Sequence, residues 1–138
     1  MTTDLAALFG GIDVYLFDQL LRGRIAPGMR VLDAGCGRGR NLVFLLREGY
    51  EVLALDPDPA AIAAVRDLAR RLAPALPEAN VRCERVDGST FPDACADVVI
   101  SNAVLHFAPD EPAFLAMLLG TWRLLAPGGL LFCRLASS

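Results

Sequence analysis

The stretch VLDAGCGRGRN, residues 31–41, places three apolar or small residues around one aspartate and then a glycine at every second position. An apolar run that leads directly into a glycine-rich turn is typical of a buried strand followed by a loop. Glycine costs conformational entropy on folding, so three glycines within five residues need a reason. The usual reason is a backbone that passes very close to another group, and we expect that of residues 35–39.

Short apolar runs and helical stretches alternate along the rest of the chain. We expect strands at 31–34, 51–55, 81–86, 97–101 and 130–135, and helices at 40–48, 59–72 and 111–125. This alternation predicts an α/β fold with a parallel sheet that is covered on both faces. In such a sheet ligands bind beyond the carboxyl ends of the strands, where the winding direction reverses. The glycine loop falls at that place.

The length of 138 residues suits a single domain, 1–138, with a helical segment at 1–27 before an α/β core at 28–138. We expect two short helices within residues 5–22, around a Gly-Gly break. No apolar stretch approaches the roughly 20 residues of a membrane helix. The first 18 residues carry acids where a signal peptide carries positive charge. We therefore expect a cytoplasmic protein with no membrane partner.

Charge and composition exclude several classes of function. The net charge of −3 opposes polyanions, so we expect no nucleic-acid partner. The four cysteines lie far apart and the chain has one histidine, so we expect no metal site. All 13 lysine-or-arginine positions hold arginine. The absence of lysine excludes a P-loop, Schiff-base chemistry and lysine-dependent dehydrogenase catalysis.

Asp56 ends the second expected strand, about 20 residues after Gly35, where an acid can accept hydrogen bonds from ribose hydroxyls. An aspartate at the end of a strand can also be an ordinary turn or cap residue. The dinucleotide fingerprint needs a small residue at position 40, and this chain has Arg40 there. Asp33, directly before the loop, would repel a pyrophosphate and attract a cationic ligand. Arg40 and Asp33 therefore disfavour a dinucleotide, and Asp33 favours a cationic ligand.

Five segments, in this order, resemble the class I S-adenosylmethionine-dependent methyltransferases. They are VLDAGCGRG (31–39), VLALD (52–56), VDGS (86–89), ADVVISNAVLHF (96–107) and LLAPGGLLFC (124–133). The resemblance covers about residues 28–135 and implies a Rossmann-like, doubly wound parallel sheet of strand order 3-2-1-4-5. The form GCGRGRN is also similar to the small-molecule and tellurite-resistance branch of this family.

The resemblance implies S-adenosylmethionine as the cofactor and gives roles to the residues around the loop. Asp56 would accept hydrogen bonds from the ribose 2′ and 3′ hydroxyls, and Asp33 would stabilise the positively charged end of the ligand. The cofactor-binding positions of the loop are Gly35, Cys36, Gly37 and Gly39, the first three lining the methionine moiety with backbone.

Further residues lie in the later segments. Asp87 would accept a hydrogen bond from the adenine amino group, and the amide of Gly88 or Ser89 would donate to a ring nitrogen. Asn102 would present its carbonyl to the ligand's amine. For Asp87 and Asn102, ordinary turn and strand-end roles are the alternative. His106 could bind the substrate or take its proton, or could be structural, so the catalytic residue is unassigned.

Relatives continue past the fifth strand with a helix and an antiparallel hairpin, whereas this chain reaches Ser138 soon after it. We therefore expect these elements to be lacking, either because the chain is a truncated piece, which we favour, or because its exposed fifth strand pairs with another chain in a homodimer. Our leading hypothesis is methyl transfer to a small-molecule acceptor. A non-catalytic or truncated module that binds the cofactor without turnover is the alternative. Arg40 and the absence of lysine disfavour a nicotinamide oxidoreductase.

Overall fold

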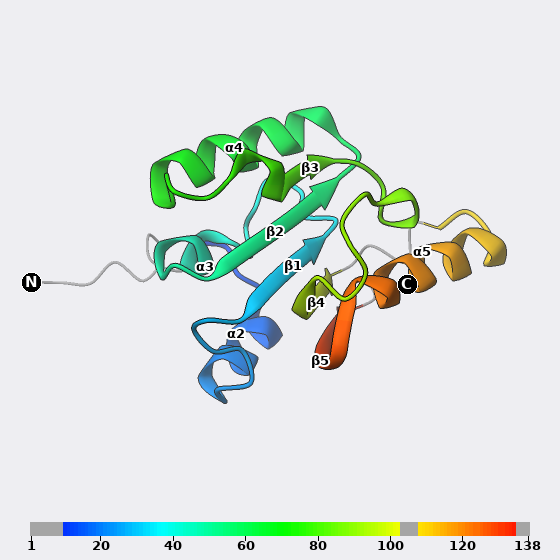
Figure 1. Ribbon diagram of the computed structural model, residues 1–138, viewed down its shortest axis with the longest axis horizontal. Coiled ribbons are helices and arrows are strands. Elements are labelled where there is room, and N and C mark those ends of the chain that lie inside the picture. Colours follow the sequence, from blue (N-terminus) through cyan, green and yellow to red (C-terminus); the bar gives the residue numbers. More distant parts are fainter. Residues whose placement is uncertain (1–9, 103–107, 135–138) are drawn as a thin grey trace, which may run out of the picture.

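The computed structural model describes residues 10–102 and 108–134 (Figure 1). One parallel sheet has the strand order β3-β2-β1-β4-β5, which confirms the predicted order and the doubly wound α/β class. The strands are β1 (Arg30–Ala34), β2 (Glu51–Asp56), β3 (Val81–Cys83), β4 (Ala96–Asn102) and β5 (Leu125–Arg134). The winding direction reverses between β1 and β4, and the glycine loop follows β1.

The described residues form four α-helices and two short 3-10 helices. The α-helices are α2 (Val14–Leu21), α3 (Val43–Arg47), α4 (Pro59–Leu72) and α5 (Glu111–Leu124), and the 3-10 helices are η1 (Glu78–Asn80) and η2 (Val86–Gly88). Of these helices, α2 precedes β1 and the others lie between strands. An aspartate caps the first turn of three of them. Asp13, Asp58 and Asp110 accept hydrogen bonds from backbone amides of α2, α4 and α5. Such a cap typically contributes about 1 kcal/mol, which explains where these helices begin.

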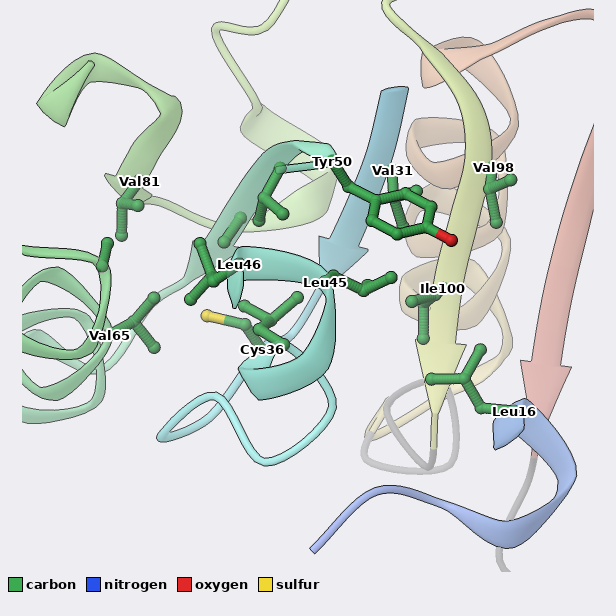
Figure 2. Close-up of a cluster of buried hydrophobic side chains, with 14 of the residues drawn as sticks. Leu16, Val31, Cys36, Leu45, Leu46, Tyr50, Val65, Val81, Val98 and Ile100 are labelled. Atoms are coloured by element: carbon green, nitrogen blue, oxygen red, sulfur yellow. The ribbon is translucent and has the colours of Figure 1, made fainter. Parts of the chain in front are cut away.

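Two apolar clusters fill the space on the two sides of the sheet. Side chains alternate between faces along a strand, so the neighbours Val31 and Leu32 of β1 belong to different clusters. The helices contribute Leu16 from α2, Leu45 from α3 and Val65 from α4 to the first cluster (Figure 2), and Met117 and Leu124 from α5 to the second. The sheet is thus covered on both faces, as its apolar strands predict.

Three predicted boundaries differ from the structure by more than one residue. The helix expected at 40–48 is only Val43–Arg47, because residues 40–42 form a turn in which the Leu42 amide donates to the Gly39 carbonyl at 2.9 Å. The strand expected at 81–86 ends at Cys83, where the chain turns into η2. β5 begins at Leu125 rather than Leu130, because its Pro-Gly-Gly segment forms an irregularity between two paired stretches. The first of the two N-terminal helices falls largely on residues outside the described part.

β5 pairs with β4 alone within the described residues, so it is an edge strand of the described sheet. Along residues 10–102 and 108–134, none of the helices has the length and hydropathy needed to span a bilayer.

Gly120 allows α5 to approach η2 closely. A Cβ at this position would lie 2.4 Å from the Val86 carbonyl oxygen. We therefore expect Gly120→Ala to lower the free energy of unfolding by about 2 kcal/mol, since an overpacked contact must move apart. Urea unfolding measures the change. The control is Ala116→Gly at an exposed position of the same helix, where helix propensity alone should cost about 1 kcal/mol. A Gly120→Ala variant more stable than wild type would contradict this packing.

Candidate functional site

Hydrogen bonds tie the glycine loop to the end of β2. The Gly35 and Cys36 amides both donate to the Leu55 carbonyl, at 2.8 and 3.0 Å. The Gly37 amide donates to Asp56 Oδ2 at 3.0 Å. Because these amides are used within the protein, they form no ready nest for a phosphate.

The structure gives different reasons for a glycine at each position of the loop. Gly35, Gly37 and Gly39 have φ of 87°, 55° and 90°, in the left-handed region that favours glycine. A Cβ at Gly37 would meet no described atom within 4 Å, so the loop is open on that side. A Cβ at Gly39 would lie 3.1 Å from Leu68 Cδ2 and 3.3 Å from Val65 Cγ2. Gly39 therefore lets the loop pack against α4.

Asp56 lies at the carboxyl end of β2 and is partly exposed. Its Oδ2 accepts from the Gly37 amide, and its Oδ1 accepts from the Asp58 amide at 2.9 Å. Each carboxylate oxygen has two acceptor sites, so each keeps one for a further donor. Asp56 thus has the turn role that the sequence left open and also the capacity to bind two hydroxyl groups.

Asp33 is 2% exposed and receives no hydrogen bond on its carboxylate from any described residue. Burial, and then repulsion from the neighbouring Asp56 carboxylate, raise the pKa of Asp33 to about 7, although Arg40 acts in the opposite direction. A buried carboxylate without donors is costly to the protein. A cationic group bound beside it would stabilise the charged form.

Cys36 is 5% exposed, and burial followed by repulsion from Asp33 raises the pKa of its thiol. A protonated, buried thiol is a poor nucleophile. Cys36 therefore contributes shape to the loop.

The segment after β3 begins beside Asp56, because the Glu84 amide donates to the Asp56 carbonyl at 3.1 Å. Asp87 is exposed and pairs with Arg85, Nε to Oδ1 at 3.0 Å. This hydrogen bond holds the pKa of Asp87 below its usual range, so Asp87 is an ionised acceptor. The Ser89 hydroxyl donates to Glu84 Oε1 at 2.8 Å. The segment thus brings the predicted residues Asp87, Gly88 and Ser89 to the same end of the sheet as Asp56.

Asn102 is the last residue of β4 and lies opposite Arg134 in the strand register. His106 belongs to residues 103–107, which lie outside the described residues. Its predicted role therefore stays a prediction.

An ion pair between the N-terminal segment and β5 was not predicted from the sequence. Asp13, 3% exposed, pairs with Arg134, whose guanidinium carbon lies 4.7 Å from the centre of the Tyr15 ring. The Asp13 amide donates to Asn41 Oδ1 at 2.8 Å. Burial raises the pKa of Asp13, but the hydrogen bonds from Arg134 and the amides of Leu16 and Tyr15 outweigh it and lower the pKa overall. An N-cap pattern could have revealed Asp13, whereas no local signal points to a partner 121 residues away.

A family model described as a methyltransferase domain matches residues 32–133. The chain is 36% identical over 109 residues to trans-aconitate 2-methyltransferase of Methylobacterium radiotolerans, a match that covers 77% of this chain and 37% of that protein. It is 34% identical over 119 residues to ubiquinone biosynthesis O-methyltransferase of Methylocella silvestris, covering 83% of this chain and 44% of that protein. The chain thus spans less than half the length of these curated relatives.

Solved structures agree with these matches. A TehB-like SAM-dependent methyltransferase from Corynebacterium glutamicum superimposes with a TM-score of 0.63 at 27% identity, covering 85% of this chain and 60% of the other. The structure reported under "Conversion of a Disulfide Bond into a Thioacetal Group during Echinomycin Biosynthesis" gives a TM-score of 0.70 at 28% identity, covering 85% and 46%. The family match, the relatives and the sheet order together show that the chain belongs to the class I S-adenosylmethionine-dependent methyltransferases, as the five sequence segments predict.

Proposed function

We propose that this chain binds S-adenosylmethionine and transfers its methyl group to a small-molecule acceptor. The observation that carries the proposal is the buried Asp33 carboxylate, which lies beside the glycine loop without a hydrogen-bond donor among the described residues. A sulfonium nucleoside brings positive charge to such a carboxylate. Asp33 and Asp56 together therefore suit this ligand better than they suit a phosphate-bearing one.

The residues present fit the parts of this cofactor. Asp56 has the spare acceptor sites for two ribose hydroxyls. Beside Gly37 no described atom would meet a Cβ, which leaves room for part of the cofactor. We propose that Asp87 with the Gly88 or Ser89 amide binds the adenine. Gly35, Cys36 and Asn102 would then contact the methionine part, with Gly39 supporting the loop from α4.

The bound cofactor supplies a methyl group already activated on a sulfonium. The chain's residues then need only bind the two reactants, orient them and exclude water from between them. Holding an acceptor in line with the methyl carbon can lower the barrier by about 7 kcal/mol or more. A general base is needed only for an acceptor that is protonated at the working pH. His106 stays our candidate for acceptor binding or for that proton.

The test is a methyl-transfer assay with radiolabelled S-adenosylmethionine and a panel of acceptors that includes trans-aconitate and small phenols. The two curated relatives carry names that point to a carboxylic acid and to ubiquinone synthesis. A labelled product supports the proposal. Binding of the cofactor with no product from any acceptor favours the alternative, a module that binds without turnover. That alternative is kept because the chain spans only 37% and 44% of these relatives.

We also propose a domain organisation, an oligomeric state and a location for this chain. We propose that residues 1–138 act as one cofactor-binding domain and that β5, an edge strand among the described residues, pairs with a second copy. We propose a cytoplasmic location, supported by four unpaired cysteines, and no nucleic-acid partner. Sedimentation equilibrium tests the dimer: a single monomer mass at all concentrations contradicts it.

A further inference from the structure

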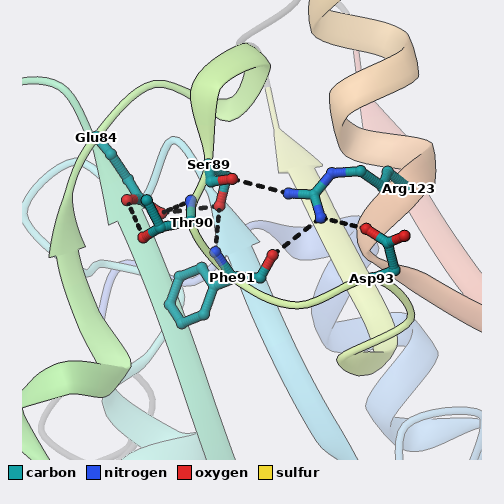
Figure 3. Close-up of polar contacts among 6 residues, drawn as sticks. All are labelled: Glu84, Ser89, Thr90, Phe91, Asp93 and Arg123. Atoms are coloured by element: carbon teal, nitrogen blue, oxygen red, sulfur yellow. Dashed lines mark hydrogen bonds and ion pairs between the residues drawn. The ribbon is translucent and has the colours of Figure 1, made fainter.

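A closed turn, residues 84–91, follows β3, and Glu84 holds it together from within. The Glu84 carboxylate accepts from the Ser89 hydroxyl at 2.8 Å, from the Thr90 amide at 3.1 Å and from the Thr90 hydroxyl at 2.7 Å (Figure 3). The Ser89 hydroxyl in turn accepts from the Phe91 amide at 3.1 Å. We name this segment the 84–91 turn. It contains all three residues proposed to bind adenine.

Arg123, in the last turn of α5, holds the same turn from the other side. Its Nη2 donates to the Ser89 carbonyl at 3.0 Å, and its Nη1 donates to the Phe91 carbonyl at 2.9 Å and pairs with Asp93 (Figure 3). The Ala94 amide donates back to the Arg123 carbonyl at 2.9 Å. A planar guanidinium can bridge two carbonyls in this way, because its donors have a fixed fork geometry.

The 84–91 turn is anchored at its two ends, and Arg82 of β3 also contacts it, because its Nη1 donates to the Thr90 hydroxyl at 2.9 Å. Its first residue, Glu84, is bonded through its amide to the Asp56 carbonyl, and Phe91 is 3% exposed in the second apolar cluster. Asp87, in the middle, is exposed and pairs only within the turn among the contacts described, with Arg85. The Gly120 contact of α5 with Val86 supports the same stretch. α5 thus contacts the turn on both sides of Asp87, through Gly120 at Val86 and through Arg123 at Ser89.

We propose that Arg123 is a positioning residue that holds the 84–91 turn in the shape that recognises the adenine base. The inference rests on the proposed function, since it assumes that the ribose lies on Asp56 and the base against Asp87–Ser89. Arg123 itself touches no ligand in this account. It acts by fixing the acceptor of Asp87 and the amides of Gly88 and Ser89 at one distance from the ribose site.

The test compares two ligands that differ only at the base. S-adenosylhomocysteine offers a 6-amino donor, and S-inosylhomocysteine offers a 6-oxo acceptor that the Asp87 carboxylate repels. We expect wild type to prefer the adenosine ligand about tenfold or more in calorimetric Kd. In Arg123→Met the affinity for the adenosine ligand should fall about tenfold while that for the inosine ligand changes little, so the preference should approach one. A general loss of folding would instead lower the affinity for both ligands equally.

Arg71→Met is the matched control. Arg71 lies in the last turn of α4, which has the same length of 14 residues as α5, and its pair with Asp67 is exposed. The preference should be unchanged in this variant. Arg123→Lys, which keeps the charge but not the fork, should lose most of the preference and serves if Arg123→Met does not fold.

An unchanged preference in the folded Arg123 variants overturns the inference and leaves the proposed function standing. Equal affinity of the wild-type chain for both ligands would also overturn the inference and leave the proposed function standing. Failure of folded wild type to bind either ligand overturns the proposed function and this inference with it.

Discussion

Asp56→Asn is expected to lower the affinity for S-adenosylmethionine about 100-fold, which corresponds to nearly 3 kcal/mol. The asparagine amide has one oxygen in place of two, so it loses a charge-assisted acceptor for ribose and also weakens one of the bonds to the Gly37 and Asp58 amides. Isothermal titration calorimetry at pH 8 measures the loss.

Asp58→Asn provides the control for this variant. It makes the same chemical change two residues along the chain, at the exposed N-cap of α4. Asparagine caps helices about as well as aspartate, so stability and affinity should both be retained. Equal affinity of Asp56→Asn and wild type for S-adenosylmethionine would show that Asp56 does not bind the ribose.

Asp33→Asn is expected to make the ligand-free protein more stable at pH 8 while weakening its binding of S-adenosylmethionine. The pKa of Asp33 is raised from 3.8 to about 7 by burial and by Asp56. Below pH 3.8 the group is protonated in the folded and unfolded chains alike. As the pH rises toward 7 the unfolded chain loses this proton and the folded chain keeps it, so stability falls, by an amount on the order of 4 kcal/mol.

Urea unfolding of wild type and Asp33→Asn at pH 4 and pH 8 measures this effect. The variant lacks the titrating group, so its stability should fall less between the two pH values. Asp67→Asn, at an exposed position of α4, should follow wild type. If Asp33→Asn is instead less stable than wild type at pH 8, the carboxylate has a stabilising partner and its cost has been misjudged.

The same group predicts the pH dependence of binding. A cationic ligand favours the ionised Asp33, so binding below about pH 7 requires the loss of one proton. The affinity of wild type should rise about tenfold from pH 5.5 to 6.5 and level off above 7.5, and that of Asp33→Asn should stay flat. A flat profile in wild type would show that Asp33 does not sense the charge of the ligand.

The fold was predictable because its signals are local. A few neighbouring residues are enough to recognise each apolar strand, the helix start at Asp58 and Pro59, and the glycine loop. The strand order came from the resemblance to the family. The end of β3 was not predictable, because Arg85 and Val86 read as strand continuation while the turn depends on Glu84 and its bonds to residues five and six positions on. Side-chain hydrogen bonds of this kind leave no periodic pattern.

The sequence named candidate site residues, and the structure adds reasons for some of them that no sequence pattern shows. Gly39 was expected among the cofactor-binding residues, and the structure adds that a side chain there would crowd Leu68 and Val65 of α4. Arg123 and Arg134 carried no signal, because an arginine near the end of a helix or strand is usually solvated. Their partners lie 34 and 121 residues away, beyond the reach of local pattern.

The most direct test of the central claim, that the loop and its two carboxylates hold a sulfonium nucleoside, is a calorimetric titration of the wild-type chain at pH 8 with S-adenosylmethionine and, separately, with NADH. We predict one S-adenosylmethionine bound per chain and no binding of NADH. Binding of NADH, with no heat from S-adenosylmethionine in folded protein, would contradict the account.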